Sequence, residues 1–233
     1  MNYIGRKYTL IDFLDEGITS FIDPSCEVFF DVFAGTGVVG WHFKRKGFRV
    51  VANDLQYYAF CLNRACVGVS RRPGFARVRK SVGLKGLDGT RRTLDYLNAL
   101  KPRKGFIFEQ YCPGGIAHPP RMYFTDENGA RCDAIRQEIA NWRDAGLLRD
   151  GEYYYLIASL IEAADRVANT ASVYAAYLKQ IKPSAQRALR MDPVDIVPSA
   201  ARHRVHFRDG AQVVARVPCD ILYMDPPYNQ RQY

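Results

Sequence analysis

The chain has 233 residues with 48% hydrophobic residues and a formal net charge of +9, from 33 Lys and Arg against 24 Asp and Glu. These values predict a soluble protein with one sizeable hydrophobic core. No apolar stretch approaches the ~20 residues of a membrane-spanning helix, and the first residues lack the apolar run of a secretion signal, so we expect no membrane partner and a cytoplasmic location.

The first predicted elements are two strands and a short helix, over residues 28–33, 48–52 and 41–46. Gly35, Gly37 and Gly40 lie between the first strand and the helix, and Asp54 follows the second strand. Glycines at such a turn let backbone N–H groups approach a ligand, and an acid after the next strand is placed to bind ribose hydroxyls. The pattern predicts a nucleoside ligand but does not separate a nicotinamide cofactor from S-adenosylmethionine.

Positive charge is concentrated in one segment, Arg64 to Lys104, which holds twelve Lys and Arg against two Asp, a net +10, while the rest of the chain sums to −1. A one-sided basic segment is typical of contact with a phosphate backbone, although many charge runs are only solvated surfaces. Its densest part, residues 71–80, contains glycine and proline that suggest loops. The candidate nucleic-acid contacts are Arg71, Arg72, Arg77, Arg79 and Lys80.

The middle of the chain predicts helices after a loop. Residues 109–115 and 118–121 are rich in Pro and Gly and are expected to be irregular. Thr125 or Asp126 is a suitable cap for a helix from about Glu127 to Gly146. Two more helices are expected over 152–169 and 172–181, and we interpret Tyr153, Tyr154 and Tyr155 as core rather than as a base-stacking surface.

The last part of the chain predicts two further strands, over residues 204–208 and 220–224. The second leads directly into Asp225-Pro226-Pro227-Tyr228. Each proline fixes φ near −65° and lacks an N–H, so the segment presents carbonyl and carboxylate acceptors beside an aromatic ring. Such a rigid cluster suits the exocyclic amino group of a flat heterocycle. The competing interpretation is a proline-rich turn without function.

The six cysteines, at positions 26, 61, 66, 112, 132 and 219, form no Cys-x-x-Cys pair and no Cys/His spacing of a metal site. We therefore expect free thiols in a reducing compartment and no metal cofactor. A Pro-Cys pair is the nucleophile motif of cytosine methyltransferases, but Cys219 precedes the last strand instead of following it. Cys219 is accordingly predicted to be a core residue.

The glycine turn and the Asp225 motif together resemble the adenine-specific DNA methyltransferases of the Dam-like class, in which the cofactor motif precedes the catalytic motif. Residues 33–37 resemble that family's cofactor loop, residues 225–228 its catalytic motif, and residues 3–7 its opening motif. The resemblance implies a doubly wound, Rossmann-like α/β sheet that uses S-adenosyl-L-methionine. It also implies double-stranded DNA as substrate in a bacterial or phage cell, with a cognate restriction endonuclease that forms no stable complex.

The same resemblance implies roles for single residues. Tyr3, Lys7 and Phe33 would contact the cofactor, with Asp54 on its ribose and Asp209 on its adenine. Asp31 would accept from the methionine amine, or would be a structural hydrogen-bond acceptor. Asp225 and the Pro226 carbonyl would hold the adenine amino group, with Asp225 also bordering the cofactor, and Tyr228 would stack on the base after it leaves the duplex.

The resemblance also implies a domain organisation. Residues 1–63 and 200–233 would form the cofactor-binding and catalytic core, and residues 64–199 a basic, largely helical insert that includes the target-recognition region. The sheet of the family continues past the catalytic motif, so we expect its C-terminal strands to lie outside this sequence.

Two other functions remain open. The first is methylation of RNA adenine or protein glutamine, whose enzymes usually carry Asn at the position of Asp225. The second is an inactive remnant that binds only cofactor or DNA. Cofactor binding without methyl transfer would indicate the remnant.

Overall fold

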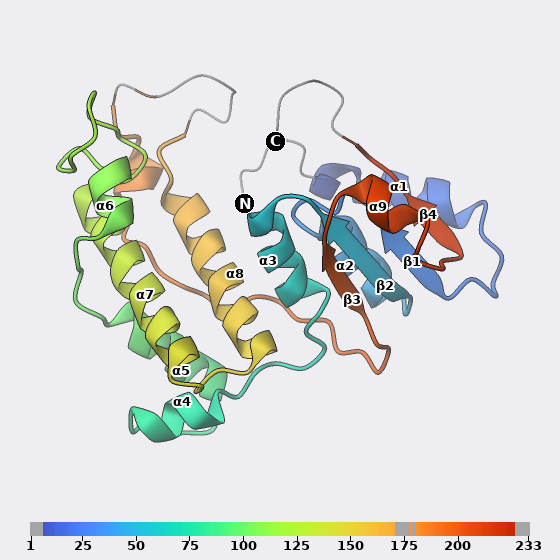
Figure 1. Ribbon diagram of the computed structural model, residues 1–233, viewed down its shortest axis with the longest axis horizontal. Helices are drawn as coiled ribbons and strands as arrows, with labels where there is room; N and C mark the ends of the chain where they lie inside the picture. Colours follow the sequence, from blue (N-terminus) through green and yellow to red (C-terminus); the bar gives the residue numbers. More distant parts are fainter. Residues whose placement is uncertain (1–6, 171–177, 179, 227–233) are drawn as a thin grey trace. The chain divides into compact units, whose positions relative to one another are not determined.

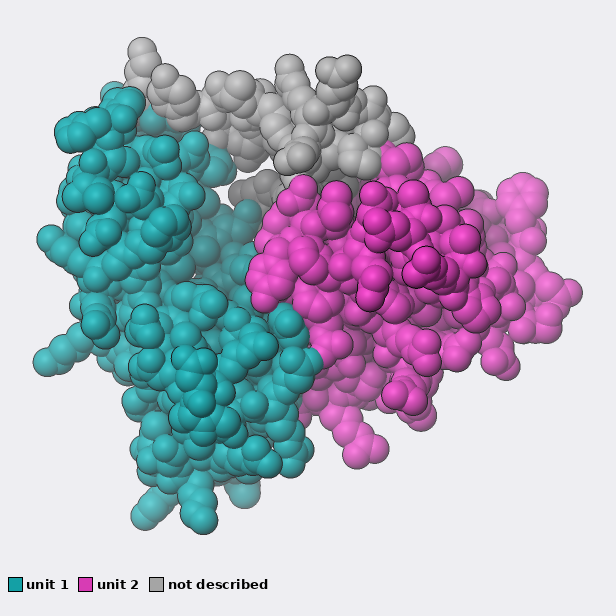
Figure 2. Space-filling view, in the orientation of Figure 1, with its two compact units in different colours: residues 1–2, 73–194 teal, residues 3–72, 195–233 magenta. Residues whose placement is uncertain are grey.

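The computed structural model describes residues 7–170, 178 and 180–226. The chain divides into two compact units, coloured separately in Figure 2. We call residues 3–72 and 195–233 the sheet unit, and residues 1–2 and 73–194 the helical unit.

The sheet unit contains four parallel strands, β1 (Val28–Asp31), β2 (Arg49–Asp54), β3 (Arg204–Phe207) and β4 (Ile221–Tyr223). Their order in the sheet is β3-β2-β1-β4 (Figure 1). The register places Phe29 opposite both Val50 and Ile221, and Asn53 opposite His206. All four strands are parallel, so their carboxyl ends form one edge of the sheet.

Alternation along the strands gives the sheet two apolar faces. Phe29, Val50 and Ala52 face one core, which also contains residues of helices α1 (Ile11–Thr19), α2 (Val38–Arg45) and α3 (Tyr57–Cys66). The 3-10 helix η1 (Lys7–Leu10) lies against α1 and α2. Val28, Phe30 and other residues of the opposite face pack against α9 (Gly210–Val214). Helices on both faces of a parallel sheet make this a mixed α/β fold of the Rossmann-like kind.

The helical unit consists of five helices and one 3-10 helix within its described residues. They are α4 (Ala76–Ser81), α5 (Gly89–Asn98), α6 (Phe106–Tyr111), α7 (Asp126–Asp144), α8 (Asp150–Val167) and η2 (Pro183–Gln186). Thr125 caps α7, its side chain accepting from the N–H of Asn128. Tyr153, Tyr154 and Tyr155 of α8 are buried, which confirms their prediction as core. Across the described ranges, no helix combines the length and apolar character of a membrane span.

All four predicted strands and the helices predicted at α2, α7 and α8 are confirmed, with ends shifted by a few residues. All six cysteines are free thiols, and Cys219 is partly buried against the core under α9. The helix predicted over 172–181 falls mainly outside the described residues.

Two predicted loops are wrong in part. Residues 109–111 belong to α6, whose first turn is capped from a distant position: the Asp133 carboxylate accepts from the N–H groups of Ile107 and Phe108 at 2.9 and 2.8 Å. Residues 76–80 belong to α4, which begins after the fully buried Phe75. In both cases a tertiary contact overrides the local glycine and proline signal.

Candidate active site

Four acidic or glycine-rich segments follow the carboxyl ends of the four strands. The glycine turn, which contains Gly35 and Gly37, follows β1. Asp54 ends β2, Asp209 follows β3 and Asp225 follows β4. The chain order reverses between β1 and β4, since β2 and β3 lie on one side of β1 and β4 lies on the other. In open parallel sheets, ligands bind outside the carboxyl ends at such a switch point.

The glycine turn requires glycine for two different reasons. Gly35 and Gly37 have φ values of 52° and 81°, in the left-handed region that other residues rarely adopt. A Cβ atom on Gly37 would lie 2.6 Å from the Cys66 sulfur, whereas one on Gly35 would meet no atom within 4 Å. Asn63 of α3 donates to the Gly35 carbonyl at 3.0 Å. The turn is therefore held from behind by α3 and is open at Gly35.

Asp54 connects the end of β2 to the glycine turn. Its Oδ2 accepts from the N–H of Gly35 at 2.7 Å and its Oδ1 from the N–H of Gln56 at 2.8 Å. Burial raises the pKa of Asp54, and the backbone N–H groups of Gln56 and Gly35 partly offset that rise. The carboxylate thus fixes the turn at the ligand edge of the sheet.

Asp31 is the most perturbed acid of the site. It is 1% exposed, and burial, followed by the charges of Asp54 and Asp225, raises its pKa to about 8. Its Oδ1 is buried and has no hydrogen-bond partner among the described residues. A buried acceptor without a partner carries a free-energy penalty that a cationic ligand group can remove.

Asp225 shares a pocket with Asp31. The pocket, of about 50 Å³, is lined by residues of the glycine turn, by Phe33, Tyr223 and Lys7, and by the two acids. Lys7 Nζ lies 2.5 Å from Asp225 Oδ2 in a half-buried ion pair. The structure therefore brings Lys7, Asp31, Phe33, Gly35 and Asp225 together, although they are far apart in the sequence.

Asp209 and Phe33 lie where β3 leads into α9. Asp209 caps α9, its Oδ1 accepting from the N–H of Ala211 at 2.9 Å, which is a structural role. Gly210 allows Phe33 to approach, because a Cβ there would lie 3.1 Å from the Phe33 ring. Asp209 itself is exposed, so the cap leaves its other oxygen accessible.

Asn53 is a positioning residue that the sequence analysis missed. It is 1% exposed, and its Nδ2 donates to the carbonyls of Val32 and Arg208, both at 3.0 Å. It thereby ties the segments after β1 and β3 to the end of β2. The only signal in the sequence is a polar residue within an apolar strand, directly before Asp54.

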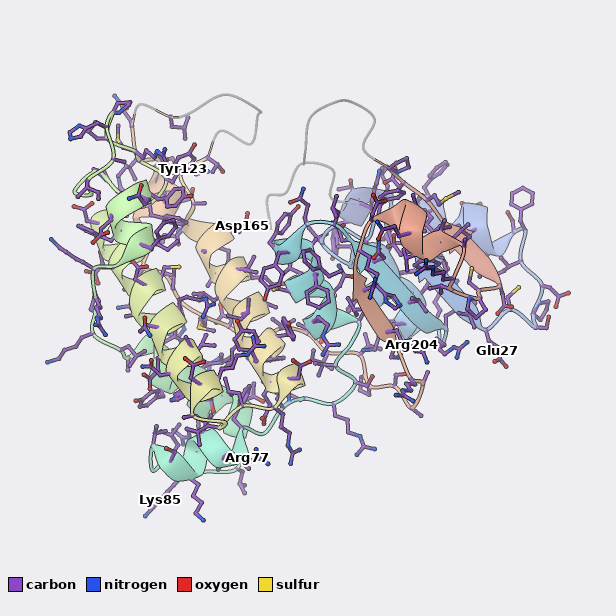
Figure 3. The ribbon with its side chains drawn as sticks, viewed as in Figure 1. Glu27, Arg77, Lys85, Tyr123, Asp165 and Arg204 are labelled. Atoms are coloured by element: carbon purple, nitrogen blue, oxygen red, sulfur yellow. The ribbon has the colours of Figure 1, made fainter. Side chains whose placement is uncertain are left out.

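Two predicted site residues, Tyr3 and Tyr228, lie outside the described residues, whereas Pro226 is described and exposed. Among the predicted phosphate contacts, Arg71, Arg72, Arg77 and Lys80 are exposed. Arg77 and the nearby Lys85 extend outward from the α4 region (Figure 3). The Arg77 guanidinium donates to the Gly146 carbonyl at 3.2 Å. Arg79 is less exposed, its guanidinium donates to the Gly86 carbonyl and its Nε is buried.

The described residues form a Rossmann-like α/β sheet with the glycine turn, Asp31 and Asp225 at the carboxyl ends of its strands. The model of the D12 class N6 adenine-specific DNA methyltransferase family matches residues 3–233, and the chain belongs to this family.

Several modification enzymes are similar over the entire chain. Type II methyltransferase M.NlaIII of Neisseria lactamica is 40% identical, and the chain covers 66% of its length. Type II methyltransferase M.FokI of Planomicrobium okeanokoites is 35% identical, with 35% of its length covered. M.CviAII of Paramecium bursaria Chlorella virus 1 is 31% identical, with 65% covered. The chain thus spans about a third to two thirds of these relatives, and no solved structure matches it.

Proposed function

We propose that the chain carries the cofactor-binding and catalytic part of a site-specific DNA adenine N6-methyltransferase of a restriction-modification system. The observation that carries this proposal is the shared pocket of Asp31, the glycine turn and Asp225. It places a candidate acceptor for an amino group beside a candidate nucleoside-cofactor site. The modification enzymes named above support the choice of DNA as substrate.

The pocket residues fit S-adenosylmethionine, which when bound supplies an electrophilic methyl group on a sulfonium sulfur. The unpartnered Asp31 Oδ1 would accept from its ammonium group, and Lys7 and Phe33 would border the same end. Asp54 would bind the ribose and Asp209 the adenine. The pocket of about 50 Å³ takes only one end of such a ligand. The remainder would lie along the carboxyl edge of the sheet, with Tyr3 against it.

Asp225 and the Pro226 carbonyl would accept the two amino hydrogens of the target adenine. The amino lone pair is conjugated into the ring and is a poor nucleophile. Methyl transfer to this nitrogen would place positive charge on it, and loss of one amino proton to solvent would then give neutral N6-methyladenine. Fixed acceptors stabilise that charge more in the transition state than in the ground state.

Lys7 occupies one oxygen of Asp225 in the absence of substrate. The ion pair would hold the Asp225 carboxylate in place beside the pocket. The adenine amino group would then share or replace this contact, and Tyr228 would stack on the flipped base.

DNA would be held by phosphate contacts from the basic segment. Arg71, Arg72, Arg77 and Lys80 are exposed and suited to this role. Arg79 would act mainly by holding the loop between α4 and α5 through Gly86. We place the target-recognition region in the helical unit, with a restriction endonuclease of the same system acting on the same sequence without a stable complex.

The test is incubation of the full-length protein with methyl-labelled S-adenosylmethionine and duplex DNA, followed by identification of the modified base. We expect N6-methyladenine. Asp225→Ala should bind the cofactor but lose ~10²–10³-fold in single-turnover rate. Label in RNA or in protein glutamine, or none at all with intact cofactor binding, would contradict the proposal.

A further inference from the structure

A second, larger pocket lies in the sheet unit away from the candidate active site. It has a volume of about 420 Å³ and lies on the α9 face of the sheet, between β2, β3 and α9. We call it the arginine groove, and its polar lining consists of Arg49, Arg202, Arg204, His206, Arg208, Gln212 and Arg216. It shares no lining residue with the pocket of Asp31 and Asp225.

Almost none of this charge is neutralised by the protein. Arg202, Arg204, Arg208 and Arg216 form no ion pair within the part of the chain that the structure describes. Arg49 lies near one acid, Asp220. The pKa of Asp220 is lowered mainly by hydrogen bonds from Glu27 and Val28, and Arg49 adds to that effect. Guanidinium groups gathered without carboxylates repel one another, and an anion would remove that repulsion.

His206 provides a second observation inside the groove. Its Nε2 is buried and has no hydrogen-bond partner among the described residues. Burial, and then the charges of Arg204 and Arg208, lowers the pKa of this histidine. The ring is therefore a neutral polar group that lies between two cations and has an unused nitrogen.

The length of the groove decides which anion fits. Arg204 begins β3 (Figure 3) and Arg208 follows the end of that strand. At ~3.3 Å per residue their backbones are about 13 Å apart. A nucleic-acid strand, with one charge per ~3.4 Å of helix axis, presents several phosphates along this length, so each arginine can contact a phosphate of its own.

We propose that the arginine groove binds successive phosphates of a nucleic-acid backbone, independently of base sequence. The contact would be additional to the basic segment at residues 71–80 and to the catalytic edge. Arg49 and Arg204 lie on β2 and β3, and the other arginines are exposed residues beside β3 and α9, an arrangement that suits a phosphate track. The groove would bind DNA that contains no target site.

The probe is a duplex made only of G·C pairs, which contains no adenine and hence no methylation target. Its affinity for the full-length protein is measured without cofactor at several salt concentrations. The test variant is Arg204→Ser with Arg216→Ser, two exposed positions whose replacement should leave the fold intact. The control is Arg45→Ser with Arg187→Ser, which removes the same charge from exposed positions outside the groove. Thermal melting of each variant verifies folding.

We expect the test variant to bind the duplex about 25-fold more weakly at 0.15 M salt, about fivefold per contact, with a log–log salt slope smaller by about 1.8. The control pair should shift affinity much less, and Arg204→Lys with Arg216→Lys should keep most of the slope.

Equal slopes for test and control would overturn the proposal. Pyrophosphate binding that is lost in the test variant while duplex binding is unchanged would also overturn it, by indicating a small-anion site. Methylation of adenine-containing duplex is scored separately, so failure of the groove and failure of the proposed enzyme are distinguishable.

Discussion

Two buried polar side chains, one in each unit, differ in how completely they are hydrogen-bonded. In the helical unit, Asn128 is 1% exposed; its Nδ2 donates to the Ala185 and Arg187 carbonyls and its Oδ1 accepts from the N–H of Leu189. In the sheet unit, Asp31 is equally buried and keeps an oxygen without a partner. Buried polar groups in folded proteins are normally satisfied, so a buried carboxylate oxygen without a partner beside a pocket indicates where a ligand belongs. Asn128 is satisfied by its own unit, and Asp31 is not.

The largest expected effect is on the pH dependence of stability. The pKa of Asp31 rises from 3.8 to about 8 on folding, so the folded protein holds a proton that the unfolded chain has lost. The free energy of unfolding should therefore decrease between about pH 4 and about pH 8, by up to ~1.4 kcal/mol per pH unit, and level off above. Chemical denaturation of the wild type and of Asp31→Asn over this range measures it. If the difference in free energy of unfolding between the wild type and Asp31→Asn does not vary with pH over this range, the pKa of Asp31 is not raised by folding.

Asn128→Ala tests whether the hydrogen bonds of Asn128 stabilise the helical unit. The substitution leaves two carbonyls and one N–H without their partner, at about 1 kcal/mol or more each, for a total of about 3 kcal/mol. Hydrogen exchange at the start of α7 should accelerate accordingly, while affinity for S-adenosylmethionine stays at the wild-type value. Reduced cofactor affinity would contradict the assignment of the cofactor site to the sheet unit alone.

A third prediction concerns the use of Asp31 by the ligand. Asp31→Asn should weaken S-adenosylmethionine binding by about 2 kcal/mol, roughly 30-fold, because a buried hydrogen bond to a charged group is lost. Asp12→Asn, at an exposed position in the first turn of α1, is the control and should bind normally. Calorimetry in buffers of different ionisation enthalpy should also show proton release by the wild type near pH 7. Equal affinity for all three proteins would make Asp31 a structural acceptor.

The parts of the fold that were predictable are those with local causes. The strands at β1 and β2, the glycine turn and Asp54 form one continuous pattern, and Thr125 precedes an amphipathic helix. The parts that were not predictable depend on distant partners. Lys44 has the sequence context of a surface lysine, yet it is 2% exposed because its Nζ donates to the carbonyls of Cys66, Val67 and Val69.

The candidate site shows the same limit. The sequence pointed to Asp31 and Asp225 by motif, but only the parallel pairing of β1 with β4 brings their strand ends together. Asn53 and the arginine groove were missed, because their contacts join segments more than 100 residues apart. A single sequence carries no direct record of such contacts.

The smallest expected effect separates two neighbouring cations of the helical unit. Lys80 is exposed, whereas Arg79 donates to the Gly86 carbonyl and lies about 3 Å from where a Cβ on Gly89 would be. Lys80→Ala should weaken duplex binding about fivefold at 0.15 M salt and reduce the log–log salt slope by about 0.9, with unchanged stability. Arg79→Ala should instead lower the free energy of unfolding by about 1 kcal/mol and leave the slope nearly unchanged. Anisotropy titrations and denaturation of the two variants, each with the same loss of one charge, measure both quantities.

If Arg79→Ala lowers the slope as much as Lys80→Ala does, the Arg79 guanidinium exchanges its Gly86 contact for a phosphate when DNA binds. If neither variant changes the slope, the α4 surface is solvated and DNA is held elsewhere.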